Sequence, residues 1–144
     1  LAHQLEQTTL NVKGKIFQIH LLMFPDYHMI NFGFKEQHNS SLEDYNALNR
    51  RFYERSSFMS GRTYQKNFLT SATSLTREEY GETPSAYARR IGIAAGEWER
   101  IESVYILRAA VMTQFLRRKE VFDDYWNDIS NEFKLILESI YQAS

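Results

Sequence analysis

The chain has 144 residues, no cysteine, and 17 Lys and Arg against 18 Asp and Glu, for a formal net charge of −1. A length of this order is typical of one domain, and the content of 43% hydrophobic and 15% aromatic residues suffices for a core, which excludes a disordered chain. The near-zero charge argues against a dedicated nucleic-acid binder, and no apolar run approaches the roughly 18 residues of a membrane span.

Two extended segments follow a polar start. Residues 1–10 are polar with scattered leucines and are expected to end a helix. Residues 16–23 and 28–34 are rich in apolar and β-branched side chains. The Pro-Asp-Tyr sequence at 25–27 favours a turn, because proline fixes φ and aspartate can bond back to the backbone. The pattern therefore predicts a hairpin.

A helix is predicted to begin near Ser40, because Ser40 and Glu43 form a capping-box pattern. Apolar residues then recur at helical spacing to about Met59, and Gly61 is a plausible end. Residues 64–75 are rich in Thr and Ser, with some apolar residues, and predict a third strand.

Residues 76–100 hold three glycines, four arginines and a possible short helix after Pro84, and are interpreted as an excursion between strands. Residues 101–112 give the strongest strand pattern of the chain, and residues 117–141 carry an apolar stripe at helical spacing. The predicted order is β-β-α-β-β-α over a single domain, 1–144. It indicates an α+β fold with the helices on one face of a small antiparallel sheet.

No group of side chains forms a recognisable catalytic or metal site in the sequence. The four histidines have no cysteine partners, and no two lie on one helical face, so no metal site is expected. Neither a phosphate-binding glycine loop nor a nucleophile-elbow serine occurs. The aromatic residues lack the flanking basic clusters of a base-stacking platform and are assigned to the core.

Arg108 is the candidate site residue that the pattern offers. It lies inside the apolar run Tyr105–Val111, where strand alternation places Ile106, Arg108 and Ala110 on one side. A guanidinium group there must reach water, a carboxylate or a partner surface, because it cannot be left unpaired. A structural ion pair and a ligand contact would both meet this requirement.

Four segments of the chain resemble one enzyme family. Pro25–Phe32 resembles the Pro-Glu-Leu-Asn-apolar-apolar-Cys-Phe-Arg strand of the group II pyridoxal-phosphate-dependent amino-acid decarboxylases, which act on glutamate, histidine, aromatic amino acids or diaminobutyrate. The other similar segments are the helix from Tyr45–Asn49 to Ser60-Gly61, the strand Thr70–Leu75, and Leu107–Phe115, which is similar to a Leu-Arg-x-x-Val strand. They occur in the family's order over about residues 24–140, within its C-terminal small domain.

The resemblance implies the small domain of a fold-type-I enzyme. The family's large domain carries a His-Lys dipeptide whose lysine binds pyridoxal phosphate, an electron sink. No histidine here is followed by lysine, so we expect no catalytic or cofactor-binding residue in this chain, no cofactor bound to it, and no activity of the chain alone. The intact protein would be a homodimeric carboxy-lyase in which this domain closes the cleft.

The resemblance also implies partners and a role for Arg108. The partners are the large domain of the same polypeptide and an amino-acid substrate, with no nucleic acid and no membrane, in the cytoplasm. Arg108 would lie near the active-site mouth and bind a substrate carboxylate, because a planar fork binds and orients a carboxylate at two points.

The chain departs from the family pattern at three places. Phe-Arg becomes Phe32-Gly33, the threonine that caps the last helix is absent near Leu116-Arg117, and residues 76–100 resemble an insertion. Two alternatives stay open beside the decarboxylase. One is the small domain of another fold-type-I enzyme, such as an aminotransferase. The other is a non-catalytic interaction or ligand-binding module.

Overall fold

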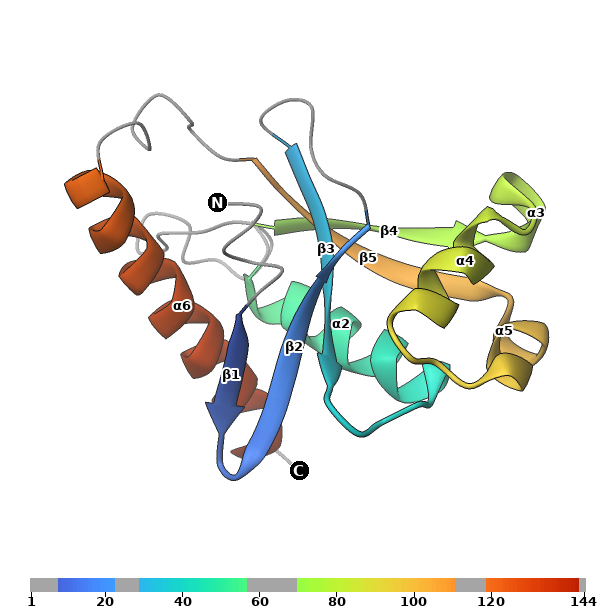
Figure 1. Cartoon of the computed structure of the whole chain (residues 1–144), viewed down its shortest axis with the longest axis horizontal. Helices are drawn as coiled ribbons and strands as arrows, with labels where there is room; N and C mark the ends of the chain where they lie inside the picture. The colour runs from blue at the N-terminus through green and yellow to red at the C-terminus, as the bar shows by residue number, and fades with distance from the viewer. Residues whose placement is uncertain (1–7, 23–28, 57–69, 111–118, 143–144) are drawn as a thin grey trace.

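The computed structural model describes residues 8–22, 29–56, 70–110 and 119–142. They form a five-stranded sheet, antiparallel throughout, in the order β1-β2-β3-β5-β4 (Figure 1). The strands are β1 (Thr9–Val12), β2 (Lys15–Leu21), β3 (Met29–Glu36), β4 (Thr70–Thr76) and β5 (Ser103–Ala110). The helices are α2 (Leu42–Ser56), α3 (Arg77–Tyr80), α4 (Thr83–Arg90), α5 (Ala95–Ile101) and α6 (Lys119–Gln142). The α+β class and the small antiparallel sheet are confirmed.

The sheet begins one strand earlier than the sequence predicted. Thr9 and Leu10 start β1, so the expected helix end at 1–10 is wrong there, while residues 1–7 lie outside the described part. β1 and β2 are joined by Lys13 and Gly14, both with positive φ (51° and 81°). Two such residues fit the tight hairpin turn that matches strand twist.

The N-terminus of α2 is capped one residue later than expected. The Ser41 Oγ accepts from the Asp44 N–H at 3.2 Å, and the Asn39 Oδ1 accepts from the Ser41 N–H at 2.8 Å. Glu43 instead forms an ion pair with Arg100 at 3.3 Å. The capping motif therefore uses Ser41 rather than Ser40.

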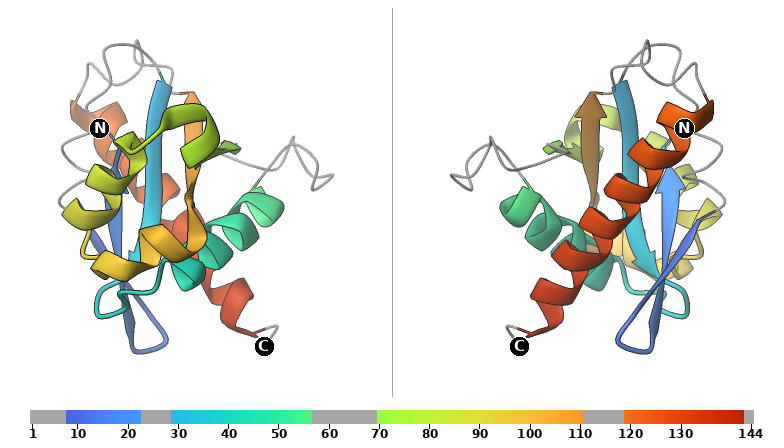
Figure 2. Two further views of the ribbon diagram at one scale, coloured as in Figure 1. Left: turned by 90° about the vertical axis from the view of Figure 1, so that its right-hand side faces the viewer. Right: turned by 90° about the vertical axis from the view of Figure 1, so that its left-hand side faces the viewer.

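Helices cover both faces of the sheet, so the expectation of one covered face is wrong (Figure 2). Leu107 packs in the core under α6, whereas its neighbour Ile106 packs in a second core under α4 and α5. Successive strand residues point to opposite faces. Because β5 is apolar on both faces, each face requires a covering layer.

Helix α2 enters the sheet between β3 and β5. These strands pair only over Met29–Phe32 and Leu107–Ala110. Beyond that point the Asn49 side chain bonds both the N–H and the carbonyl of Phe34, each at 2.8 Å. The Asn46 side chain does the same for the Tyr105 N–H and the Ser103 carbonyl, at 2.8 and 2.9 Å. The two amides replace the missing strand pairing, and the backbone groups stay satisfied.

The excursion between β4 and β5 consists of three short helices. The helix predicted after Pro84 is α4, which starts at Thr83 with the proline in its first turn. Ion pairs with Glu82 at 2.8 Å, with Glu99 at 2.9 Å and with Glu102 place Arg77 at the centre of this layer.

Helix α6 confirms the last predicted helix. The described stripe residues are all buried and comprise Ile129, Phe133, Ile136, Leu137 and Ile140. Phe133 lies against Phe32, Phe34 and Phe52, with ring centroids 5.2–6.0 Å apart. The side chains of the other predicted stripe members, Phe122, Tyr125 and Trp126, lie outside the described residues.

Candidate functional site

Arg108 lies on β5 and is exposed, on the face that α4 and α5 partly cover. The predicted alternation is confirmed, because Ile106 and Leu107 point into different cores. Asn31 of β3 and Ser71 of β4 stand directly opposite Arg108 on its two sides. The three residues therefore form a polar row across β3, β5 and β4, near the end of the sheet where β3 and β4 begin.

The guanidinium group of Arg108 is held at one edge. Its Nε donates to the Asn31 Oδ1 at 3.0 Å. Within the described ranges Arg108 forms no ion pair, so the predicted structural ion pair is not found among them. Because the side chain is exposed, its two terminal amino groups are open to a ligand or to another part of the protein.

A groove opens on the same face of the sheet. It has a volume of about 380 Å³ and lies under α4. Its lining is mostly apolar and consists of Leu22, Leu75, Tyr80, Thr83, Pro84, Ala86, Tyr87 and Arg90. The Leu22 N–H donates to the Asn31 carbonyl at 2.9 Å, so the groove and Arg108 both adjoin Asn31.

A pair of tyrosines fixes α4 above the sheet. The hydroxyls of Tyr45 and Tyr87 lie 3.0 Å apart in the buried layer. Burial, with Tyr87 beside it, holds the pKa of Tyr45 well above its ordinary value. The Arg90 guanidinium lies over the Tyr87 ring and donates to the carbonyls of Leu21 and Leu22. These contacts fix one wall of the groove.

Gly33 explains how Tyr45 reaches this position. A Cβ atom at residue 33 would lie 2.8 Å from the Tyr45 Cζ and closer still to its hydroxyl. Any larger residue, including the arginine of the decarboxylase pattern, would displace the ring. The departure noted at Phe32-Gly33 is therefore a packing requirement of this chain.

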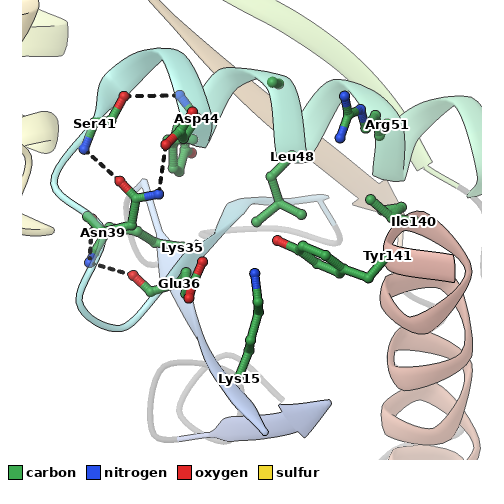
Figure 3. A pocket seen from close by; sticks show the side chains of 12 residues that line it. Lys15, Lys35, Glu36, Asn39, Ser41, Asp44, Leu48, Arg51, Ile140 and Tyr141 are labelled. Carbon is green, nitrogen blue, oxygen red and sulfur yellow. Dashed lines mark hydrogen bonds between the residues drawn. The ribbon is translucent and has the colours of Figure 1, made fainter. Parts of the chain in front are cut away.

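A second cavity, of about 360 Å³, lies between the N-terminal half of α2 and the end of α6 (Figure 3). Its polar groups mostly serve the fold. Asp44 and Ser41 belong to the helix cap, and Asp44 also accepts from the Asn39 amide at 2.9 Å. The Lys15 ammonium lies 4.4 Å from the Tyr141 ring centroid. The cavity thus has the character of a structural pocket.

Comparison with known proteins assigns the chain to a family. The family model described as "Tyrosine decarboxylase, C-terminal" matches residues 1–137. The chain belongs to this tyrosine decarboxylase C-terminal family. It is 37% identical to an L-tyrosine decarboxylase of Enterococcus faecium over 136 residues, which are 94% of this chain and 22% of that relative.

Two further relatives carry the same name. The chain is 36% identical over 139 residues to an L-tyrosine decarboxylase of Enterococcus faecalis, and 34% identical over 139 residues to one of Levilactobacillus brevis. Each match covers 96% of this chain and 22% of the relative, so the chain spans about a fifth of these relatives. The expectation of a decarboxylase C-terminal domain is confirmed.

The one lysine that is buried in the described part of the chain does not fit the role of a cofactor-binding lysine. Lys35 is buried, and its ammonium donates to the carbonyls of Glu36, Gln37 and Asn39 at 3.0–3.1 Å. Burial lowers its pKa, but the three carbonyls occupy its protons. Lys13, Lys15 and Lys134 are exposed. Pyridoxal phosphate needs a lysine amine that is free to bond to it.

The sequence placed Arg108 on the correct face but missed its partner. Asn31 lies in the segment Pro25–Phe32 that resembles the decarboxylase family, but its sequence pattern gives it no role, because only the β3–β5 register brings it opposite Arg108. The groove was also missed, since its lining combines Leu22, which follows β2, with residues of β4, α3 and α4. In the described part of the chain, no helix is long and apolar enough to cross a bilayer.

Proposed function

We propose that this chain is the C-terminal domain of a pyridoxal-phosphate-dependent decarboxylase of L-tyrosine or a related aromatic amino acid. The observation that carries the proposal is the family match over residues 1–137, together with relatives that are named L-tyrosine decarboxylases. Those relatives are about four to five times as long as the match. The lysine that binds the cofactor therefore belongs to the rest of the polypeptide.

In this proposal the Arg108 face of the domain meets the large domain and closes the active-site cleft. The starts of β3 and β4 and the end of β5 lie at the same end of the sheet (Figure 1), and Arg108 is two residues from the end of β5. Arg108 is exposed there and has no ion pair among the described residues. An exposed cation beside an apolar groove suits an amino acid with one carboxylate and one aromatic ring.

The role assigned to Arg108 is to bind the substrate carboxylate. A guanidinium group can contact both carboxylate oxygens, which fixes the plane of the group as well as its position. Closure of the domain would also exclude water around this contact and so strengthen it. The intact enzyme is proposed to be a homodimer on the strength of the family resemblance alone.

The full-length protein, loaded with pyridoxal phosphate and supplied with L-tyrosine, provides the test. We expect CO₂ and the corresponding amine in equal amounts. Replacement Arg108→Met keeps the apolar stem and removes the charge. It should lower kcat/KM, and the ratio of the two values should correspond to a loss of about 2 kcal/mol or more in transition-state stabilisation. This is the order seen for hydrogen bonds to charged groups.

Arg89→Met is the matched control, because Arg89 is an exposed arginine of α4 outside the groove lining. It should leave kcat/KM unchanged. A keto acid without CO₂ release would identify an aminotransferase instead. No turnover of any amino acid by correctly folded, cofactor-loaded protein would favour a non-catalytic module.

A further inference from the structure

We propose that Asn31 is a positioning residue that sets the orientation of the Arg108 guanidinium for carboxylate binding. This inference rests on the proposed function and adds a residue to the same site. Asn31 holds its place by strand register, since the two residues are direct partners in the β3–β5 pairing. The Asn31 carbonyl also accepts from the Leu22 N–H at 2.9 Å, so its backbone is fixed from the other side.

The hydrogen bond selects one edge of the guanidinium group. The Asn31 Oδ1 accepts from the Arg108 Nε at 3.0 Å, and within the described ranges the Arg108 side chain makes no other hydrogen bond. A guanidinium group has five N–H donors in one plane. With Nε occupied, the pair of terminal nitrogens remains available, which is the edge that presents two parallel N–H groups to a carboxylate.

The chemistry of the amide suits this task better than the obvious alternatives. A carboxylate at residue 31 would neutralise the guanidinium charge and compete with the substrate. An aliphatic residue would leave Nε without an acceptor and the long side chain free to rotate, at an entropic cost on binding. A neutral acceptor fixes the plane of the guanidinium group, and the full positive charge of that group stays available to the ligand.

The position of the row supports a ligand-facing role. Ser71 flanks Arg108 on β4, so the residues opposite it on both neighbouring strands carry no charge. One row further along the sheet, Ile106 is fully buried under the helical layer, whereas Arg108 is exposed. The polar row therefore begins where the covering helices end. The cation of this row, Arg108, is oriented by Asn31 and is not neutralised by it.

A double-mutant cycle on the cofactor-loaded, full-length protein tests this role, with Asn31→Leu, Arg108→Met and the double variant. We expect Asn31→Leu to lower kcat/KM for L-tyrosine about tenfold, chiefly through KM, because a misplaced binding group costs this much or more. In the Arg108→Met background the same replacement should have little further effect. Asn31→Asp keeps the acceptor but adds a carboxylate that competes with the substrate, so it should lower kcat/KM as well.

Inhibition by substrate fragments separates positioning from a purely structural effect. Asn31→Leu should weaken competitive inhibition by 3-(4-hydroxyphenyl)propanoate, which has the carboxylate, and leave inhibition by tyramine, which lacks it, unchanged. Asn127→Leu, at an exposed position of α6, is the matched control and should change neither. The thermal midpoints of all variants should agree within about 2 °C, a small shift for a chain of this size.

The possible failures have different meanings. An active protein in which Arg108→Met matters but Asn31→Leu does not would overturn this inference alone. Equal weakening of both inhibitors would assign Asn31 a structural role and also overturn it. No change on Arg108→Met would remove the carboxylate role from the proposed function, and with it this inference. Absence of decarboxylation in the unmodified protein would contradict the proposed function itself.

Discussion

Gly33 determines how closely α2 approaches β3. The Tyr45 ring lies directly over it, and the Tyr45 hydroxyl continues to Tyr87 on α4. We expect Gly33→Ala to destabilise the domain by about 1–3 kcal/mol, because the added methyl group overpacks a buried site. Chemical denaturation of the 144-residue chain measures the loss.

Gly96→Ala is the matched control, since a Cβ at Gly96 meets no atom within 4 Å. Gly96 lies inside α5, so the alanine should be neutral or slightly stabilising. Equal stability of the two variants would show that Tyr45 can move away, and that the close approach at Gly33 is not required.

Single residues were predictable where one strand alone determines their position. The face of Arg108 follows from alternation along β5, because a strand's period is fixed. The partner of Arg108 depends on which strands pair and in what register, and β3 and β5 are far apart in the chain. The cap at Ser41 was missed by one position for a similar reason, since the Asn39 side chain selects it from outside the helix.

Among the described side chains of α6, Phe133 is the fully buried aromatic ring. Phe133 is fully buried against three other phenylalanines, while Leu135, two residues on, is 63% exposed. Phe133→Ala should therefore cost about 3–5 kcal/mol. Against a typical domain stability of about 5–15 kcal/mol, this loss is large enough to unfold part of the population.

Leu135→Ala serves as the control on the same helix. Its side chain is mostly in water, so the replacement should change the unfolding free energy by less than about 0.5 kcal/mol. Thermal and urea denaturation of both variants measure these changes in the free energy of unfolding. A Phe133→Ala variant as stable as Leu135→Ala would contradict the arrangement of this core.

Among the elements, the long amphipathic ones followed from the sequence and the short ones did not. The stripe of α6 and the apolar run of β5 are periodic over enough residues to identify. β1 has four residues and is stabilised by its pairing with β2 rather than by local preference. In residues 76–100 the sequence predicts one helix of the three, because α3 and α5 have only four and seven residues. These short helices are held by contacts such as the ion pairs of Arg77.

As a whole molecule, the chain is expected to lack a specific covalent site for pyridoxal phosphate. Lys35, the buried lysine of the described part, is held by three carbonyls. Mixing the 144-residue chain with cofactor and reducing with borohydride should label exposed lysines in a scattered way. Peptide mass spectrometry reads the positions, and Lys35→Met should not alter the pattern. A stoichiometric adduct on one lysine would contradict the assignment as a C-terminal small domain.

The two helical layers were not predictable, because a sequence does not show which face of a strand each helix covers. β5 is apolar on both faces, which is compatible with a central strand in any layered fold. The expectation of one covered face failed at Ile106, whose burial requires the second layer of α4 and α5. Neither the entry of α2 between β3 and β5 nor the groove beneath α4 has a local sequence signal.

The entry of α2 between β3 and β5 divides the sheet into two halves. One half is the meander β1-β2-β3, whose contacts are local in sequence, and the other is β4 with β5. They share four residue pairs and the side-chain amides of Asn46 and Asn49. A join of this kind is where a protein opens first below global unfolding, so amide hydrogens at the join should exchange sooner than those inside either half. Because Arg108 and Asn31 lie in those four pairs, opening of the join would separate them, and closure would bring the guanidinium back to its oriented state.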